Sequence, residues 1–108
     1  MSQLFVGDQY SVPGGVGRPR LATREDQSVL DKVKKEFVKL SGTNPSRFKA
    51  ILVSTQVVAG KNYFFKVETG DNSYIHIKAF VPMHQRSKEP SLLAFQLNRE
   101  REEDLEYF

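Results

Sequence analysis

Residues 48–81 read FKAILVSTQVVAGKNYFFKVETGDNSYIHIKAFV, and this stretch decides the fold. Residues 48–58 are rich in β-branched side chains. In residues 63–69 and 74–81, successive side chains fall alternately into two sets, as they do on the two faces of a strand. Such patterns predict strands, and the turn residues Gly70-Asp71-Asn72 separate the last two. Further along, residues 82–90 predict a loop and residues 91–98 a fourth strand. The short connections indicate antiparallel hairpins.

The segment before these strands predicts one long amphipathic helix. It begins after Thr23, which can cap the helix together with Asp26 in a capping-box-like pattern. The apolar stripe of this helix consists of Val29, Leu30, Val33, Phe37 and Leu40. Gly42 can end the helix, and Pro45 prevents its continuation. We therefore expect an α+β fold in which one long helix packs across a four- to five-stranded antiparallel sheet.

Length and composition favour a single compact domain. The chain has 108 residues, which is too few for two domains of ordinary size. It contains no cysteine, which excludes disulfides, thiolate metal sites and a cysteine nucleophile. Pro13-Gly14-Gly15 and Gly17-Arg18-Pro19 interrupt any periodicity near the N-terminus. Residues 1–22 are therefore predicted to be a flexible arm, and residues 23–108 a single domain.

The first residues show no secretory pattern. Residues 1–8 lack a basic region, and the apolar run Leu4-Phe5-Val6 is too short for a signal peptide. No segment approaches the length of a transmembrane helix. The sequence therefore predicts a cytoplasmic protein without a membrane partner, and it leaves release by a non-classical route open.

One hairpin tip has an unusual composition. A tip is ordinarily polar, whereas Gln56-Val57-Val58-Ala59-Gly60 places three apolar residues at or near a turn. Gly60 supplies the positive φ that a tight turn needs. An exposed apolar tip is costly in solution and useful in a partner's groove. The alternative is that Val57 and Val58 belong to a buried strand and that the turn lies later.

The same five residues, QVVAG, are similar to the hairpin signature of the cystatin family. Other stretches that resemble the family are Pro13-Gly14-Gly15, where it keeps an N-terminal glycine, and residues 60–67, 70–78 and 104–108. The similarity covers about residues 13–108 and is greatest to the stefin branch, which lacks disulfides and signal peptides. The chain differs in having a longer arm. It also has Met83 and His84 in the second loop, where the family tends to carry leucine and proline.

The resemblance implies a reversible, tight-binding inhibitor of papain-like cysteine peptidases of the cathepsin type. Such an inhibitor blocks the active-site cleft with an N-terminal arm and two hairpin loops, without catalysis, metal or cofactor. The residues that the resemblance assigns to peptidase contact are Pro13, Gly14, Gly15, Gln56, Val57, Val58, Ala59, Gly60, Pro82, Met83 and His84. It further implies a monomer, or a dimer in which two chains exchange the helix and first strand through Gln56–Gly60.

Three alternatives compete with this interpretation. An enzyme is disfavoured because the chain has only two histidines, His76 and His84, and no recognisable catalytic spacing. His76 is expected to be a solvated strand residue, and the carboxylates of residues 100–106 to form a solvated tail. A nucleic-acid partner is not expected, since residues 61–68 lack the glycine and final aromatic of an RNA-recognition strand. An interaction module on the cystatin fold, with a partner other than a peptidase, remains open.

Overall fold

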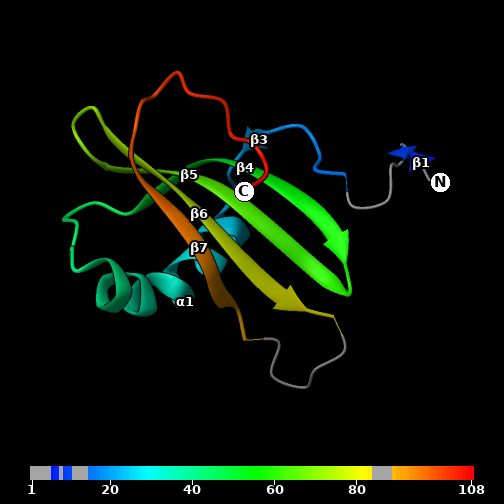
Figure 1. The fold of residues 1–108 in the computed structure, drawn as a ribbon, viewed down its shortest axis with the longest axis horizontal. Coiled ribbons are helices and arrows are strands. Elements are labelled where there is room, and N and C mark those ends of the chain that lie inside the picture. Colours follow the sequence, from blue (N-terminus) through cyan, green and yellow to red (C-terminus); the bar gives the residue numbers. More distant parts are fainter. Residues whose placement is uncertain (1–5, 8, 11–14, 84–88) are drawn as a thin grey trace.

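The computed structural model describes residues 6–7, 9–10, 15–83 and 89–108 (Figure 1). In chain order the elements are β1 (Val6–Gly7), β2 (Gln9–Tyr10), β3 (Arg20–Leu21), α1 (Arg24–Ser41), β4 (Lys49–Val58), β5 (Gly60–Gly70), β6 (Ser73–Pro82) and β7 (Ser91–Arg99). The main sheet is five-stranded and antiparallel, in the order β3-β4-β5-β6-β7. With α1 across one face, it is the α+β fold predicted from the sequence.

The two ends of α1 lie at the residues that were predicted to cap the helix. The Thr23 side chain accepts from the Asp26 amide, and the Asp26 carboxylate accepts from the Thr23 amide, which completes a capping box. At the other end, Gly42 has a φ of 75° and closes the helix in the left-handed conformation. Among the described residues, no helix combines the length and the apolar character needed to cross a membrane.

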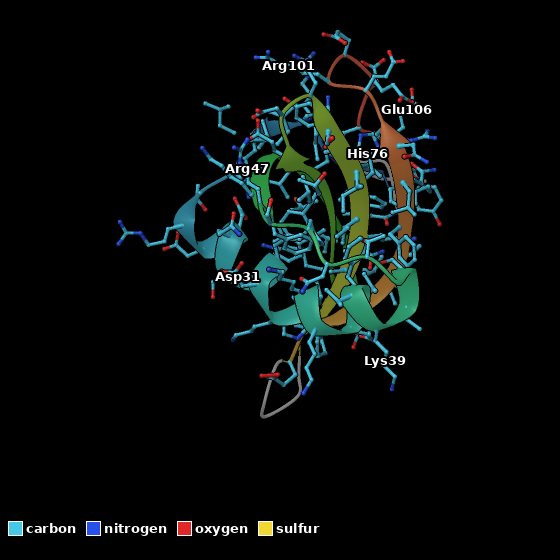
Figure 2. All side chains as sticks on the ribbon, turned by 90° about the vertical axis from the view of Figure 1, so that its left-hand side faces the viewer. Asp31, Lys39, Arg47, His76, Arg101 and Glu106 are labelled. Carbon is cyan, nitrogen blue, oxygen red and sulfur yellow. The ribbon has the colours of Figure 1, made fainter. Side chains whose placement is uncertain are left out.

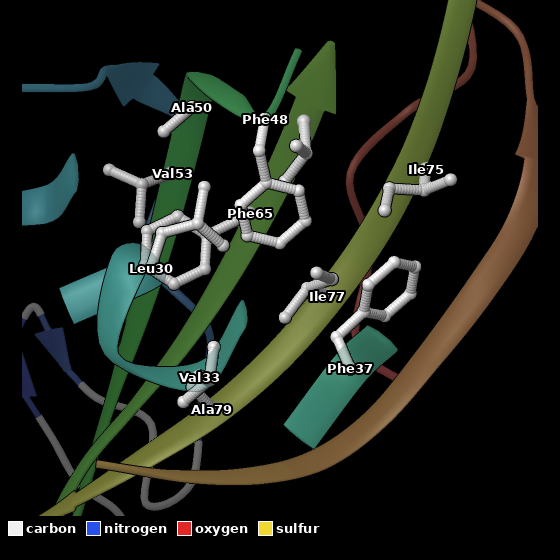
Figure 3. Close-up of a cluster of buried hydrophobic side chains, with 11 residues drawn as sticks. Leu30, Val33, Phe37, Phe48, Ala50, Val53, Phe65, Ile75, Ile77 and Ala79 are labelled. Atoms are coloured by element: carbon white, nitrogen blue, oxygen red, sulfur yellow. The ribbon is translucent and has the colours of Figure 1, made fainter. Parts of the chain in front are cut away.

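The core lies between α1 and the inner face of the sheet (Figure 3). Leu30, Val33 and Phe37 point from the helix into this layer, and the Phe37 ring packs edge-on against Phe95 at 5.1 Å between centroids. The sheet side of the cluster consists of Phe48, Ala50, Val53, Phe65, Val67, Ile75, Ile77 and Ala79. Each large apolar side chain buried here stabilises the fold by roughly 1.5–3 kcal/mol.

Leu40, the last residue of the predicted stripe, does not join this core. Its side chain is 61% exposed and borders a surface depression with Lys32, Lys35 and Lys39. The stripe that reaches the sheet therefore ends at Phe37, one turn before the helix does. This part of the prediction was wrong.

The N-terminal segment also differs from the prediction of a flexible arm up to residue 22. Arg20 and Leu21 pair with Val53 and Leu52 as strand β3, and Ala22 donates to the Ile51 carbonyl at 3.1 Å. A strand of two residues is too short to show a periodic pattern, so the sequence did not reveal it. Residues 1–5, 8 and 11–14 of the predicted arm lie outside the described residues.

A second layer covers the outer face of the sheet, opposite α1. The C-terminal segment runs across it, with Tyr107 and Phe108 rings 5.6 Å and 5.8 Å from the buried Phe64 ring. Lys66 Nζ donates to the Arg101 carbonyl at 2.6 Å, and Lys78 Nζ donates to the Phe108 oxygen at 2.9 Å. The carboxylates of Glu100, Glu102, Asp104 and Glu106 are exposed, as expected, although the segment that carries them is anchored to the sheet by the buried Leu105 and the two rings.

His76 lies on this outer face and is only 2% exposed, so the expectation of a solvated residue was wrong (Figure 2). The alternating pattern of β6 correctly placed His76 on the outer face, but the C-terminal segment covers that face and excludes water from it. Its Nε2 has no hydrogen-bond partner among the described residues. Burial lowers the pKa of His76 below its usual value, and the facing positive charges of Lys66 and Arg99 add to this, against Glu103.

This environment makes stability depend on pH. Below the ordinary histidine pKa of about 6.5, the unfolded chain takes up a proton that folded His76 resists. Stability is therefore lost as pH falls from 6.5 toward the lowered pKa of the folded state. We expect His76→Gln to lose less thermal stability than the parent between pH 7.5 and pH 5, in circular-dichroism melts. Equal losses in both proteins would contradict this assignment.

Candidate functional site

Three segments meet at one end of the main sheet, on the right-hand side of Figure 1. They are the arm before β3, the β4–β5 hairpin tip, and the end of β6. Of the residues assigned by resemblance, those brought together here are Gly15, Gln56, Val57, Val58, Ala59, Gly60, Pro82 and Met83. The other three, Pro13, Gly14 and His84, lie outside the described residues.

The pairing register directs the arm toward the tip. Arg20 lies opposite Val53, and the Gly17 amide donates to the Thr55 carbonyl at 2.9 Å. Because the two segments are antiparallel, each step back along the arm advances one step along β4. Extending this register brings the exposed Gly15 to the level of Val58 when counted from Arg20, and of Val57 when counted from the Gly17–Thr55 hydrogen bond. The arm therefore runs along the edge of β4 and reaches the hairpin tip.

The tip itself is apolar and exposed. β4 continues to Val58 and β5 resumes at Gly60, so the chain reverses at Ala59. Val57 is 68% exposed and Val58 39% exposed, which excludes the alternative of a buried strand with a later turn. Apolar side chains on a protruding turn have little to stabilise them in water. Their chemistry suits a surface that becomes buried in a partner.

A buried pair of amide side chains joins β4 and β5 next to the tip. Gln56 and Asn62 lie directly opposite each other and are both buried, and Asn62 Nδ2 donates to Gln56 Oε1 at 2.9 Å. A buried amide pair of this kind ties the two strands together just before they enter the exposed turn. The contribution of Asn62 was not foreseen from the sequence. Its position opposite Gln56 becomes apparent only once the turn is placed at Ala59.

Gly60 sets how closely the tip lies to β6. Its φ is 140°, and it pairs with Pro82 at the end of β6. A Cβ on Gly60 would lie 2.4 Å from the Val81 carbonyl oxygen and 2.8 Å from the Phe80 ring. Both the backbone conformation and the space therefore require glycine. This close approach places the first tip and the start of the second loop next to each other.

A hollow of about 250 Å³ separates the tip from Met83. Its lining residues are Val57, Gly60, Lys61, Tyr63, Val81, Pro82 and Met83. Met83 is 45% exposed and extends the apolar surface beyond the buried Pro82. Lys61 supplies the positive charge here, with its ammonium 5.6 Å from the Tyr63 ring centroid. The end of the sheet thus presents a mainly apolar, uneven edge.

Tyr63 lines the hollow at this edge. Burial raises the pKa of Tyr63, and the negative charge of Asp26 raises it further, so the hydroxyl stays protonated at neutral pH. Within the described part of the chain, no group of three or more His, Asp or Glu side chains is placed to hold a metal ion. The residues of the edge itself offer exposed apolar surface and backbone groups.

The close approach at Gly60 leads to a stability prediction. Gly60→Ala should lower the free energy of unfolding by about 1–3 kcal/mol because alanine is strained at this positive φ. The contact of its Cβ with the Val81 carbonyl oxygen should lower it further. Gly42→Ala is the matched control, because Gly42 also has a positive φ but has open space around it. Urea unfolding curves of the two variants and the parent measure the difference. A Gly60→Ala variant no less stable than Gly42→Ala would contradict the close packing at the tip.

Comparison with known proteins identifies the family of the chain. The cystatin domain profile matches residues 14–100. Cystatin-A of Homo sapiens is 34% identical over 97 residues, which is 90% of this chain and 99% of that protein. Cystatin-B of Bos taurus is 36% identical over 95 residues, which is 88% of this chain and 97% of that protein. Leukocyte cysteine proteinase inhibitor 1 of Sus scrofa is 35% identical over 95 residues, which is 88% of this chain and 92% of that protein. With its cysteine-free sequence, the chain belongs to the cystatin family and is of the stefin type.

Proposed function

We propose that this protein is a reversible, tight-binding inhibitor of papain-like cysteine peptidases of the cathepsin type. The observation that carries the proposal is the exposed apolar tip at Val57 and Val58, with the arm on one side and Met83 on the other. It is further supported by kinship with a relative whose name describes a cysteine proteinase inhibitor. The protein acts as a plug and performs no reaction of its own.

In this proposal the hairpin tip enters the active-site cleft of the peptidase. Burial of Val57 and Val58 removes apolar surface from water, and each side chain contributes up to roughly 1.5–3 kcal/mol if fully covered. The tip is already held by strand pairing and by the Asn62–Gln56 hydrogen bond, so little conformational freedom is lost on binding. Met83 is unbranched and adaptable, and it fills an irregular hollow on the primed side of the cleft.

The arm occupies the unprimed side in an extended conformation. Its glycines, Gly14 and Gly15, let the backbone pass close to the catalytic cysteine without a side-chain clash. The tip resists cleavage because Val57 and Val58 are paired with Lys61 and Gly60 in the hairpin. A paired backbone cannot align a peptide bond with the nucleophile as an extended substrate does. Inhibition then results from blocked access alone.

Two further expectations belong to this proposal. The protein acts as a monomer in the cytoplasm, and a domain-swapped dimer would merge β4 and β5 through Gln56–Gly60 and so remove the tip. The alternative of a cystatin-fold module with a different partner shares the same exposed edge. A titration of papain distinguishes the two, because only the inhibitor abolishes hydrolysis of a small fluorogenic substrate.

We expect papain to lose its activity at near-stoichiometric amounts of the parent protein and to recover it after dilution and competition by substrate. Met83→Ala should raise the inhibition constant roughly five-fold, since loss of a buried apolar contact costs about 1 kcal/mol. Leu93→Ala on β7 is the matched control, because Leu93 is similarly exposed but is not among the residues of the proposed edge. Its inhibition constant should equal that of the parent.

Two outcomes would contradict the proposal at different levels. If papain stays fully active at a large excess of the parent, the protein is not an inhibitor of this class of peptidase. If the parent inhibits but Met83→Ala is indistinguishable from it, the second loop does not belong to the contact. The arm and the first hairpin would then supply the affinity.

A further inference from the structure

Strand β3 makes few stabilising contacts through its own side chains. It has only two residues, Arg20 and Leu21, at the edge of the sheet, and Leu21 is 76% exposed. A two-residue edge strand that buries little apolar surface has low local stability. Its backbone hydrogen bonds to β4 therefore need support from elsewhere in the molecule.

That support is an ion pair between Arg20 and Asp26. Arg20 Nη1 lies 2.6 Å from Asp26 Oδ2, and Nη2 lies 3.1 Å from Oδ1, which is a bidentate arrangement. The same carboxylate accepts hydrogen bonds from the Thr23 amide at 2.8 Å and the Thr23 hydroxyl at 2.9 Å. Asp26 is only 3% exposed, so its charge is satisfied by these donors and hardly by water.

The electrostatics agree with this geometry. Burial by itself raises the pKa of Asp26, but the hydrogen bonds from Arg20 and Thr23 outweigh it and leave the pKa below its usual value. The hydrogen bond to Asp26 is likewise the main cause that raises the pKa of Arg20. The carboxylate is therefore ionised at neutral pH and holds the guanidinium from the first turn of α1.

We propose that the Arg20–Asp26 ion pair is a positioning device that aligns the N-terminal arm with the hairpin tip and so slows dissociation of a bound peptidase. The inference rests on the proposed function. Arg20 lies five residues after Gly15, a distance of about 17 Å in extended chain. Fixing Arg20 to the helix therefore fixes the direction in which the arm leaves the sheet.

Without this anchor the arm would be tethered from Thr23, at the start of α1. The free tether would then include residues 15–22, and the arm would reach its place in the cleft less often. Affinity gained by holding a binding segment in its bound direction is lost when the segment moves freely. The tip would still enter the cleft first, so the association rate should change little.

Arg20 can be removed without removing the helix cap. The capping box consists of Thr23 and Asp26 alone and does not require the guanidinium. Arg20→Gln is therefore the informative variant, whereas a change at Asp26 would disturb both features. Arg47→Gln is the matched control, since Arg47 is also about half-exposed and pairs with Glu68 and Asp71 at 3.5 Å, away from the arm.

The test is a double-mutant cycle on the dissociation rate from papain. The four proteins are the parent, Arg20→Gln, a chain lacking residues 1–15, and the combination of both changes. We expect Arg20→Gln to raise the dissociation rate about 2- to 5-fold, as befits an ion pair with one half-exposed partner, and to leave the association rate unchanged. In the shortened chain, Arg20→Gln should have no further effect, and Arg47→Gln should have none in either background.

Three results would overturn the inference, two from the dissociation kinetics and one from the free protein. The first is a dissociation rate for Arg20→Gln equal to that of the parent, which would show that the ion pair has no effect on the complex. The second is an increase in dissociation rate that is as large in the shortened chain as in the full chain, which would show that the ion pair does not act through the arm. Amide hydrogen exchange of the free protein tests the anchor without a peptidase. Arg20→Gln should speed exchange at Gly17, which donates to Thr55, and leave the core amides of α1 unchanged. Unchanged protection at Gly17 would contradict the anchor. A parent that fails to inhibit papain would contradict the proposed function, and with it the effect on dissociation, but not the anchoring of the arm.

Discussion

Burial of one face of α1 against the inner face of the sheet is the constraint on which the other features depend. Leu30, Val33 and Phe37 are all at most 1% exposed, so the helix can take only one rotation about its axis. That rotation places Asp26, in the first turn, beside β3 and within reach of Arg20. The arm in turn follows the edge of β4 toward the tip. The direction of a surface segment is thus set by packing in the core.

The proposed binding edge combines parts of different stiffness. The first tip is rigid, because strand pairing, the Asn62–Gln56 hydrogen bond and the contact of Gly60 with β6 all restrict it. The arm is held at Gly17 and Arg20 by a backbone hydrogen bond and an ion pair, which are weaker than core packing. A rigid part loses little entropy on binding, and a tethered part adds contacts once the first is in place. This division suits the proposed inhibitor, which would have to enter a narrow cleft and then stay bound there.

Sequence patterns were sufficient for the features that depend on local chemistry. The capping box at Thr23, the end of α1 at Gly42 and the positive φ at Gly60 each follow from one or two side chains, and all three were predicted. The four long strands followed from alternation and turn residues. The apolar tip was recognised, although its exposure could not be decided until the turn was located at Ala59.

The features that were missed depend on contacts between distant parts of the chain. Strand β3 is too short to show a period, and its ion pair joins residues whose proximity requires the packed helix. His76 alternates as an outward-facing residue should, but the C-terminal segment covers that face. Alternation shows which residues share a face, and it does not show whether a later segment packs over that face.

The account claims that the arm, the first tip and the second loop form one continuous binding edge. Its most direct measurement is amide hydrogen exchange of the protein, free and bound to papain whose catalytic cysteine has been blocked. The account predicts slower exchange in the complex at residues 15–17, 57–61 and 81–83, with the exposed side of α1 and the C-terminal segment unchanged. Protection centred on α1 or on residues 100–108, with none at the tip, would contradict it.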